Sequence, residues 1–187
     1  IYITTNASLP ERIKEFAKEI GVSVFRGSEN DVMMRILEAA QSIDGELQVQ
    51  TTGDCPFIDA QIIDLVIEKF LEGNGKYDFV SNEIIRSYPI GLDCRVFPVN
   101  ILAKAERLCS DPIHRKHGST YIYNGEGKNN FVSKNVLAPE VLNHPDLRWT
   151  LDEQADLDFI RNVASYFKER LIDFKAKDLI GWIDKNP

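Results

Sequence analysis

Three short segments of the sequence carry side chains that could bind an anion or a metal ion. The first, residues 52–56 with the sequence TGDCP, follows an alternating apolar and polar stretch and precedes an amphipathic helix. If that stretch is a strand of a parallel α/β sheet, Asp54 lies at its carboxyl end, where the ligands of such sheets gather. Gly53 would let the backbone approach a ligand closely, and Pro56 would stiffen the turn. The alternative is that Asp54 only initiates a turn.

The second segment is residues 148–152, with the sequence RWTLD. Thr150-Leu151-Asp152-Glu153 has the spacing of a capping box, which places Asp152 in the first turn of a long helix. In one interpretation Asp152 has only a structural role, because a carboxylate in the first turn interacts favourably with the helix dipole, by roughly 0.3–1 kcal/mol. Alternatively, Asp152 pairs with Asp54 at the edge of the sheet. Two carboxylates suit Mg²⁺, because this ion takes few protein ligands and completes its shell with phosphate oxygens and water.

The third segment is a basic cluster at residues 114–117, with the sequence HRKH. His-x-x-His could suggest zinc, but neither a finger nor a metalloprotease context surrounds it. In an acidic protein such a cluster suits an anionic substrate, and Arg115 could form a forked contact with a carboxylate. A solvated surface loop is the other interpretation.

The elements that would position these segments alternate between strand and helix in the first half of the chain. Residue patterns typical of strands occur at 1–5, 22–25, 47–51 and 77–81. Between them, apolar residues three and four apart predict helices, the clearest of which begins at Asp59 and ends at Gly73. This alternation predicts an α/β fold with a mostly parallel sheet and helices on both faces.

The second half of the chain is less regular. A strand is expected at 92–97, a helix at 100–109, and loops with a hairpin from 111 to 145. A long helix opened by residues 150–153 and a last helix at 176–185 complete the expected elements. No internal repeat or linker interrupts the pattern. We therefore predict a single domain over 1–187, with an irregular lobe at 86–145.

Composition excludes several classes of protein. The 187 residues include 22 Lys and Arg against 29 Asp and Glu, a net charge of −7, which argues against nucleic-acid binding. Apolar runs are too short for a membrane span, and the three cysteines occur singly, which disfavours a disulfide framework. GxGxxG, Walker A and GxSxG motifs do not occur. A cytoplasmic protein is expected. Because the sequence begins within a strand-like stretch, we expect that a further segment precedes Ile1.

Taken together, six segments resemble the cytidylyltransferase family that activates acidic sugars as CMP-sugars, above all its spore-coat-polysaccharide branch. CMP-acylneuraminate and CMP-deoxyoctulosonate synthetases are relatives. Each segment is modest alone, but they follow the family's order and cover nearly the whole chain. They are GVSVFRGSENDV (21–32), TGDCPFID (52–59), YDFVSN (77–82), GLDCRVF (91–97), RKH (115–117) and RWTLDEQADL (148–157).

The resemblance implies a Rossmann-like nucleotidyltransferase fold and a homodimer. It also implies that a sugar hydroxyl attacks the α-phosphate of CTP and that pyrophosphate leaves. Mg²⁺ would be held by Asp54 and Asp152, which would be the catalytic residues. The nucleotide would be bound by Arg26, Arg35, Thr52 and Gly53. The acidic sugar, or a dimer interface, would be contacted by Asn82, Asp93, Arg115 and His117.

The sequence departs from the family pattern in two ways. The family's glycine- and arginine-containing phosphate loop would lie upstream of Ile1. Arg95 stands where an acidic residue is usual, and KHGS at 116–119 replaces a typical EHVT, so the accepted sugar is expected to differ. Two other functions remain as alternatives: a metal-dependent glycosyltransferase, and a non-catalytic partner that kept the fold without the phosphate loop.

Overall fold

The computed structural model describes the chain apart from Ala7, Leu9 and Pro187 and the side chains of Glu169, Leu171 and Ile172. Strands and helices alternate through the first half, so the predicted α/β class is confirmed. The chain divides into two compact units, residues 1–48 with 97–133 and residues 49–96 with 134–187. The lobe predicted at 86–145 is shared between these units.

The first unit is built on a two-stranded parallel sheet and a group of helices. Strand β1 (Tyr2–Thr5) pairs with β2 (Ser23–Arg26), and helix α1 (Glu11–Glu19) connects them. The remaining elements are α2 (Val32–Gln41), α4 (Val99–Leu108), α5 (Pro112–Lys116) and the 3₁₀ helices η1 (Gly118–Ile122) and η2 (Gly125–Asn130). Helix α2 is the centre of this group, because it contacts α4, α5 and η1.

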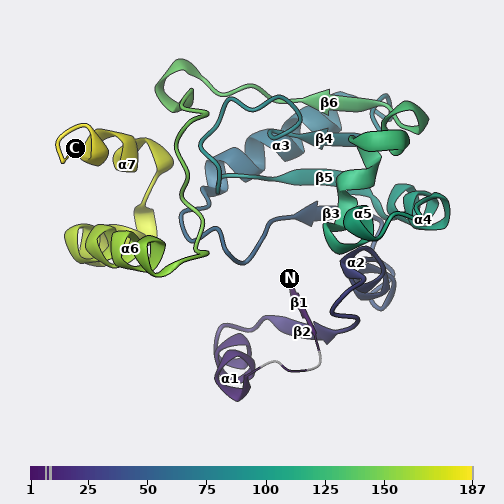
Figure 1. Ribbon diagram of the computed structural model, residues 1–187, viewed down its shortest axis with the longest axis horizontal. Coiled ribbons are helices and arrows are strands. Elements are labelled where there is room, and N and C mark those ends of the chain that lie inside the picture. Colours follow the sequence, from purple (N-terminus) through teal and green to yellow (C-terminus); the bar gives the residue numbers. More distant parts are fainter. Residues whose placement is uncertain (7, 9, 187) are drawn as a thin grey trace. The chain divides into compact units, whose positions relative to one another are not determined.

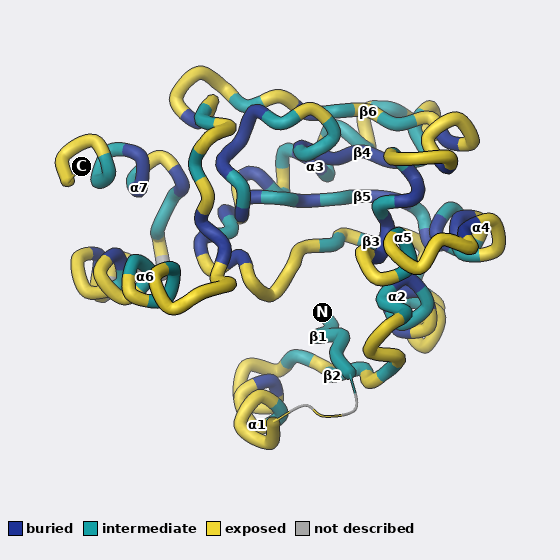
Figure 2. The backbone as a smooth tube through the Cα atoms, viewed as in Figure 1, coloured by how far each residue is buried: buried dark blue, intermediate teal, exposed yellow. Residues whose placement is uncertain are grey.

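Helix ends in the first unit follow the local sequence. Asp31 caps α2, since its carboxylate accepts the N–H of Met34 at 3.0 Å. The apolar face predicted for α1 is buried only at Ala17, whereas Phe16 and Ile20 are 54% and 51% exposed. Figure 2 shows this helix mostly in the exposed colour.

The second unit holds most of a four-stranded sheet in the order β3-β5-β4-β6 (Figure 1). The strands are β3 (Leu47–Gln50), β4 (Phe79–Ser81), β5 (Arg95–Pro98) and β6 (Ser133–Asn135). Strands β4 and β5 are antiparallel, with Val80 opposite Val96. Helix α3 (Ala60–Glu72) lies across one face of this sheet, where its Val66 packs among Val80 and Val96.

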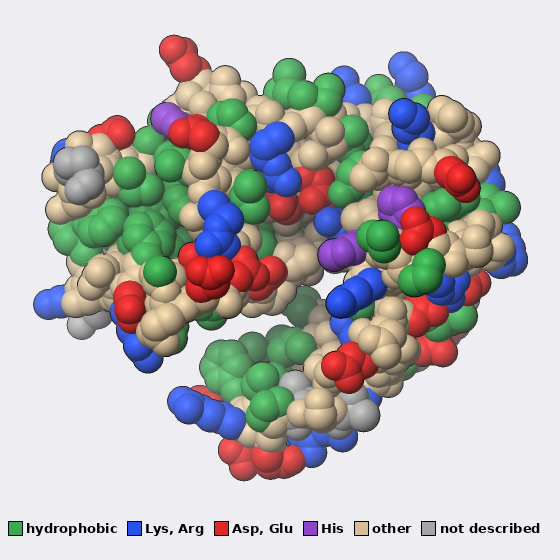
Figure 3. Space-filling model, in the orientation of Figure 1, with side chains coloured by type: hydrophobic (Ala, Val, Ile, Leu, Met, Phe, Trp, Pro, Cys, Tyr) green, Lys and Arg blue, Asp and Glu red, His purple; other side chains and the backbone are tan. Residues whose placement is uncertain are grey.

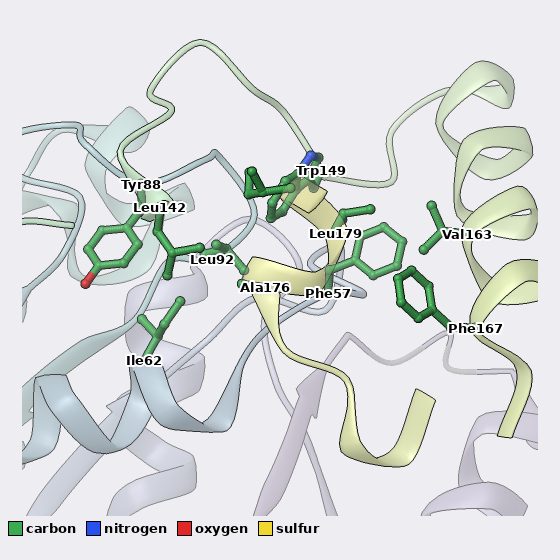
Figure 4. Close-up of a cluster of buried hydrophobic side chains, with 11 residues drawn as sticks. Phe57, Ile62, Tyr88, Leu92, Leu142, Trp149, Val163, Phe167, Ala176 and Leu179 are labelled. Carbon is green, nitrogen blue, oxygen red and sulfur yellow. The ribbon is translucent and has the colours of Figure 1, made fainter. Parts of the chain in front are cut away.

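A second hydrophobic cluster contains residues of α3, α6 (Gln154–Phe167), α7 (Ala176–Ile183) and the 3₁₀ helix η3 (Glu140–Leu142). The 3₁₀ helix η4 (Lys168–Asp173) follows α6. Phe57 contacts Trp149 edge to face, at 6.4 Å between ring centroids (Figure 4). Asp59 caps α3 as predicted and also accepts the N–H of Ala176 at 2.8 Å. This one buried carboxylate therefore joins the starts of two helices.

Among the described residues, no helix is long and apolar enough to cross a membrane.

The entry into α6 differs from the prediction. The helix begins at Gln154, so Asp152 precedes it instead of lying in its first turn. The carboxylate of Asp156 accepts the N–H groups of both Asp152 and Glu153, at 2.9 and 2.8 Å. It thus takes the capping role that the sequence pattern had given to residues 150–153.

The region expected as loops and a hairpin, 111–145, contains α5, three 3₁₀ helices and β6.

Gly91 offers a test of how the second unit is held together. Its φ is +105°, and an added Cβ would lie 3.0 Å from the carbonyl carbon and oxygen of Trp149. We expect Gly91→Ala to lower the free energy of unfolding by about 1–3 kcal/mol, because alanine is strained at this φ. Gly181→Ala, in α7 with nothing within 4 Å of the added Cβ, should instead raise it by about 0.5–1 kcal/mol. Urea unfolding of both variants measures the difference, and equal effects would contradict the close approach at Gly91.

Candidate functional site

The loop after β3 presents Asp54 to solvent. Thr52, Gly53 and Asp54 are exposed, whereas Cys55 is buried. The Sγ of Cys55 lies 3.0 Å from the Thr52 hydroxyl and 3.6 Å from a carboxylate oxygen of Asp54. Burial, the largest effect, raises the pKa of Cys55 to about 11, so its thiol stays protonated at neutral pH. Cys55 therefore anchors the turn and is not a nucleophile, while Asp54 faces outward.

A backbone hydrogen bond joins this loop to the segment that carries Asp152. The N–H of Leu151 donates to the carbonyl of Asp54 at 2.8 Å. The same segment is held from another side, because the N–H of Ile90 donates to Leu147 and the N–H of Trp149 donates to Ile90, at 2.8 and 2.7 Å. Asp54 and Asp152, far apart in the sequence, thus lie on segments that are directly bonded to each other.

Arg148 and Asp156 fix the orientation of the Asp152 side chain. One carboxylate oxygen of Asp152 accepts from Arg148 at 2.6 Å and from the Thr150 hydroxyl at 2.7 Å. The other terminal nitrogen of Arg148 donates to Asp156 at 2.6 Å. Asp156 also accepts two backbone N–H groups, which hold its pKa below the usual range. In Figure 3, acidic and basic side chains lie together where the chain approaches α6.

Sequence reasoning chose this segment but missed Arg148 and Asp156 as functional candidates. A usable signal exists: Asp156 lies three residues after Glu153, the spacing at which an acidic side chain caps the backbone preceding a helix.

The donor set at Asp54 and Asp152 fits Mg²⁺. Both side chains are exposed, and the described bonds of Asp152 use only one of its two carboxylate oxygens. The described residues contain no group of three or more His, Cys, Asp and Glu placed to hold a metal ion. Mg²⁺ is commonly bound in proteins through one or two carboxylates, with substrate phosphates and water completing its shell.

Asn82 makes hydrogen bonds within the chain, and the contact with the sugar or a dimer interface predicted for it stays a prediction. Asn82 is fully buried, and its amide donates to the carbonyl of Leu92 and accepts the N–H of Cys94, both at 2.8 Å. These bonds fix the backbone on both sides of Asp93. The side chain of Asp93 is 17% exposed and pairs with Arg86. Burial, the largest effect, raises the pKa of Asp93.

Arg95 is the residue that departs from the family pattern, and its positive charge is neutralised by another side chain of the same protein. Its guanidinium forms a forked contact with Glu83, and one of the two bonds measures 3.0 Å. The two side chains are only 12% and 6% exposed. Their charges therefore cancel inside the protein.

Both arginines predicted to bind the nucleotide belong to the first unit. Arg26 is exposed at the end of β2. Arg35, on α2, donates to the carbonyl of Ser28 at 2.8 Å, and its Nε is buried without a partner among the described atoms. Burial lowers the pKa of Arg35. Gly27 makes room for this side chain, since an added Cβ would lie 2.8 Å from its Cγ.

Arg115 is engaged within the first unit. Its Nε donates to Asp31 at 2.8 Å, and Nη2 contacts Asp31 and Glu106 at 2.5 and 2.9 Å. Its Nη1 donates to the carbonyls of Glu106 and Cys109, at 3.2 and 3.0 Å. A guanidinium has five N–H donors, and these contacts occupy all of them. This arrangement holds Arg115 within the first unit, and its predicted contact with the acidic sugar or a dimer interface stays a prediction. His117, predicted alongside it, is exposed at the end of α5.

A cavity of about 780 Å³ lies between α3 and β6, away from the residues predicted for the site. Its lining includes Lys69, Tyr77 and Lys134 but neither Asp54 nor Asp152. We therefore build the candidate site from the bonded segments and not from this cavity.

The role of Arg115 can be tested against its neighbour. We expect Arg115→Ala to lower the free energy of unfolding by about 1–3 kcal/mol, because it leaves two carboxylates and two carbonyls without their donor. Lys116→Ala, which removes an exposed side chain, should change it by less than about 0.5 kcal/mol. Chemical unfolding measures both. If the two variants are equally stable, the structural role of Arg115 is wrong.

Comparisons with known proteins identify relatives of this chain. The sequence model of a family described as cytidylyltransferase matches residues 3–182. An uncharacterized protein of Methanocaldococcus jannaschii is 33% identical over all of this chain and 73% of its own length. The spore coat polysaccharide biosynthesis protein SpsF of Bacillus subtilis is 27% identical, over 89% of this chain and 67% of its own.

Two solved structures are similar in fold. A cytidylyltransferase from Leptospira borgpetersenii is 33% identical, with a TM-score of 0.90 over all of this chain and 76% of its own. A CMP:2-keto-3-deoxy-manno-octonic acid synthetase solved with CTP has a TM-score of 0.60 at 11% identity, over 88% of this chain and 80% of its own. At that identity, the second likeness concerns the fold alone.

Proposed function

The chain belongs to the cytidylyltransferase family and is a nucleotidyltransferase, and we propose that it transfers a cytidylyl group from CTP to an acidic sugar, giving a CMP-sugar and pyrophosphate. The observation that supports this reaction most is the hydrogen bond from the Leu151 N–H to the Asp54 carbonyl, which joins the two segments that carry the exposed side chains of Asp54 and Asp152. Family membership favours this reaction over the glycosyltransferase alternative. By resemblance, the proposal includes a homodimer, a cytoplasmic location and a part in surface polysaccharide or glycan synthesis.

The proposed reaction needs positioning and charge neutralisation more than acid–base chemistry. A sugar hydroxyl attacks the α-phosphate of CTP, and pyrophosphate leaves. Mg²⁺ held by Asp54 and Asp152 would neutralise negative charge on the triphosphate. Arg148 and Thr150 would keep the Asp152 carboxylate oriented, since both donate to the same oxygen. Thr52 and Gly53 lie exposed beside Asp54, where they can contact the nucleotide.

Neutralising each carboxylate tests the proposed metal site. Asp54→Asn and Asp152→Asn should each abolish pyrophosphate release from CTP at all Mg²⁺ concentrations, because an amide binds Mg²⁺ far more weakly than a carboxylate. Both side chains are exposed, so unfolding free energies should stay within about 0.5 kcal/mol of the unaltered chain. Asp146→Asn, an exposed residue of the segment that leads to Asp152, is the control and should remain active.

These assays use CTP with GTP for comparison, and N-acetylneuraminic acid and 2-keto-3-deoxy-manno-octonic acid as acceptors. Full turnover by either Asn variant would contradict the metal site. Pyrophosphate release from GTP but not from CTP would contradict the proposed nucleotide.

A further inference from the structure

Four charged side chains form a cluster on the turn between β4 and β5 and on the start of β5. They make two ion pairs, Arg95 with Glu83 and Arg86 with Asp93. Asp93 lies two residues before Arg95, at which β5 begins. The cluster contains two cations and two anions and is electrically balanced.

The two arginines of this cluster are not equally open to a ligand. Arg95 and Glu83 are 12% and 6% exposed, so this pair is closed to solvent. Arg86 is 30% exposed, and its partner Asp93 is 17% exposed. Each terminal nitrogen of Arg86 makes one described bond, and both go to Asp93. Three of the five guanidinium donors, including Nε–H, therefore have no partner among the described residues.

Asp93 lies near the bridge that joins its own segment to the segment that leads to Asp152. Ile90 is bonded to the segment that leads to Asp152, and Asp93 follows Ile90 by three residues. An extended chain rises about 3.3 Å per residue, which places Asp93 within about 10 Å of that bridge. Asn82 fixes the backbone around Asp93, so this placement is rigid. The charges of Asp54 and Asp93 both act on the thiol of Cys55, which agrees with the short separation.

We infer that Arg86 is the residue that binds the carboxylate of the acidic sugar, through the guanidinium edge that Asp93 leaves open. This inference rests on the proposed function and names the residue that would set its substrate class. A guanidinium can hold one carboxylate on its terminal nitrogens and a second along its Nε edge. Asp93 keeps Arg86 in place before the sugar binds, and its carboxylate can accept a bond from a neighbouring sugar hydroxyl.

The chemistry of the acceptor adds a reason for this position. In 2-keto sugar acids the carboxylate is attached to the carbon that carries the anomeric hydroxyl. The oxygen of the reacting hydroxyl is therefore only two bonds away from the carboxylate carbon that Arg86 would hold. Arg86 would thus position the nucleophile as well as recognise the acid, whereas Arg115 has no donor left for this purpose.

Binding of a sugar acid and of its uncharged ester tests this inference. The probes are N-acetylneuraminic acid, its methyl ester and 2-keto-3-deoxy-manno-octonic acid, each titrated by calorimetry onto the full chain. We expect the unaltered chain to bind an acid at least about tenfold more tightly than the ester. Arg86→Lys keeps the charge but loses the fork, and should weaken acid binding by about tenfold without changing ester binding.

Removing Arg86 alone leaves Asp93 unpaired and could unfold the unit, so a paired variant is included. Arg86→Met with Asp93→Asn removes both charges and should lose the preference for the acid over the ester. Arg161→Lys, an exposed arginine of α6 that is 68% exposed, is the matched control and should bind as the unaltered chain does. Failure of the unaltered chain to bind either acid, equal binding of acid and ester, or equal behaviour of the Arg86→Lys and Arg161→Lys variants would overturn the inference.

Steady-state pyrophosphate release separates this inference from the proposed function. With Arg86→Lys, KM for the acid should rise about tenfold while KM for CTP stays within about twofold. A chain that binds the acids through Arg86 but releases no pyrophosphate from CTP would contradict the proposed function and leave the inference standing. Turnover with unchanged KM for the acid in Arg86→Lys would contradict the inference and leave the function standing.

Discussion

The candidate site depends on backbone hydrogen bonds that three separate segments make with one another. Ile90 is bonded to Leu147 and Trp149, and Leu151 is bonded to Asp54. Backbone groups that lose water must find partners in the protein, so these bonds fix the register of the three segments. Gly91 permits the contact, because its φ of +105° and its lack of a side chain let the backbone of Trp149 come close. The acidic side chains are then placed by a frame that does not depend on them.

Charge around this frame is arranged in pairs. Asp152 and Asp156 share Arg148, Asp93 faces Arg86, and Glu83 faces Arg95. Without these cations, several carboxylates so close together would repel one another and resist ionisation. Asp54, in contrast, has no ion-pair partner among the described residues. It is therefore able to attract a positive ion, which agrees with the proposed role in binding Mg²⁺.

Local sequence patterns predicted the α/β class, the start of a helix at Asp59, and the place of Asp54 after a strand, because each depends on residues close together in the chain. The start of α6 was misplaced by a few residues, since Asp156 inside the helix accepts the N–H groups of Asp152 and Glu153, whereas the Thr150 hydroxyl donates to Asp152. The roles of Asn82 and Arg115 depended on partners elsewhere in the chain, such as Leu92 and Asp31, which spacing does not reveal. The direction of β5 relative to β4 likewise depends on the turn between them.

The contrast between Arg115 and Arg86 explains why residue type alone does not identify a binding arginine. All five guanidinium donors of Arg115 are engaged within the chain. A ligand could bind this guanidinium only by breaking bonds that hold α2, α4 and α5 together. Arg86 is half-buried, which strengthens its attraction for an anion, yet donors along one edge remain unoccupied by described groups. Recognition of an acid therefore requires an arginine that is fixed in position but keeps some N–H donors unoccupied. In the second unit, the ion pair with Asp93 fixes Arg86 in this way.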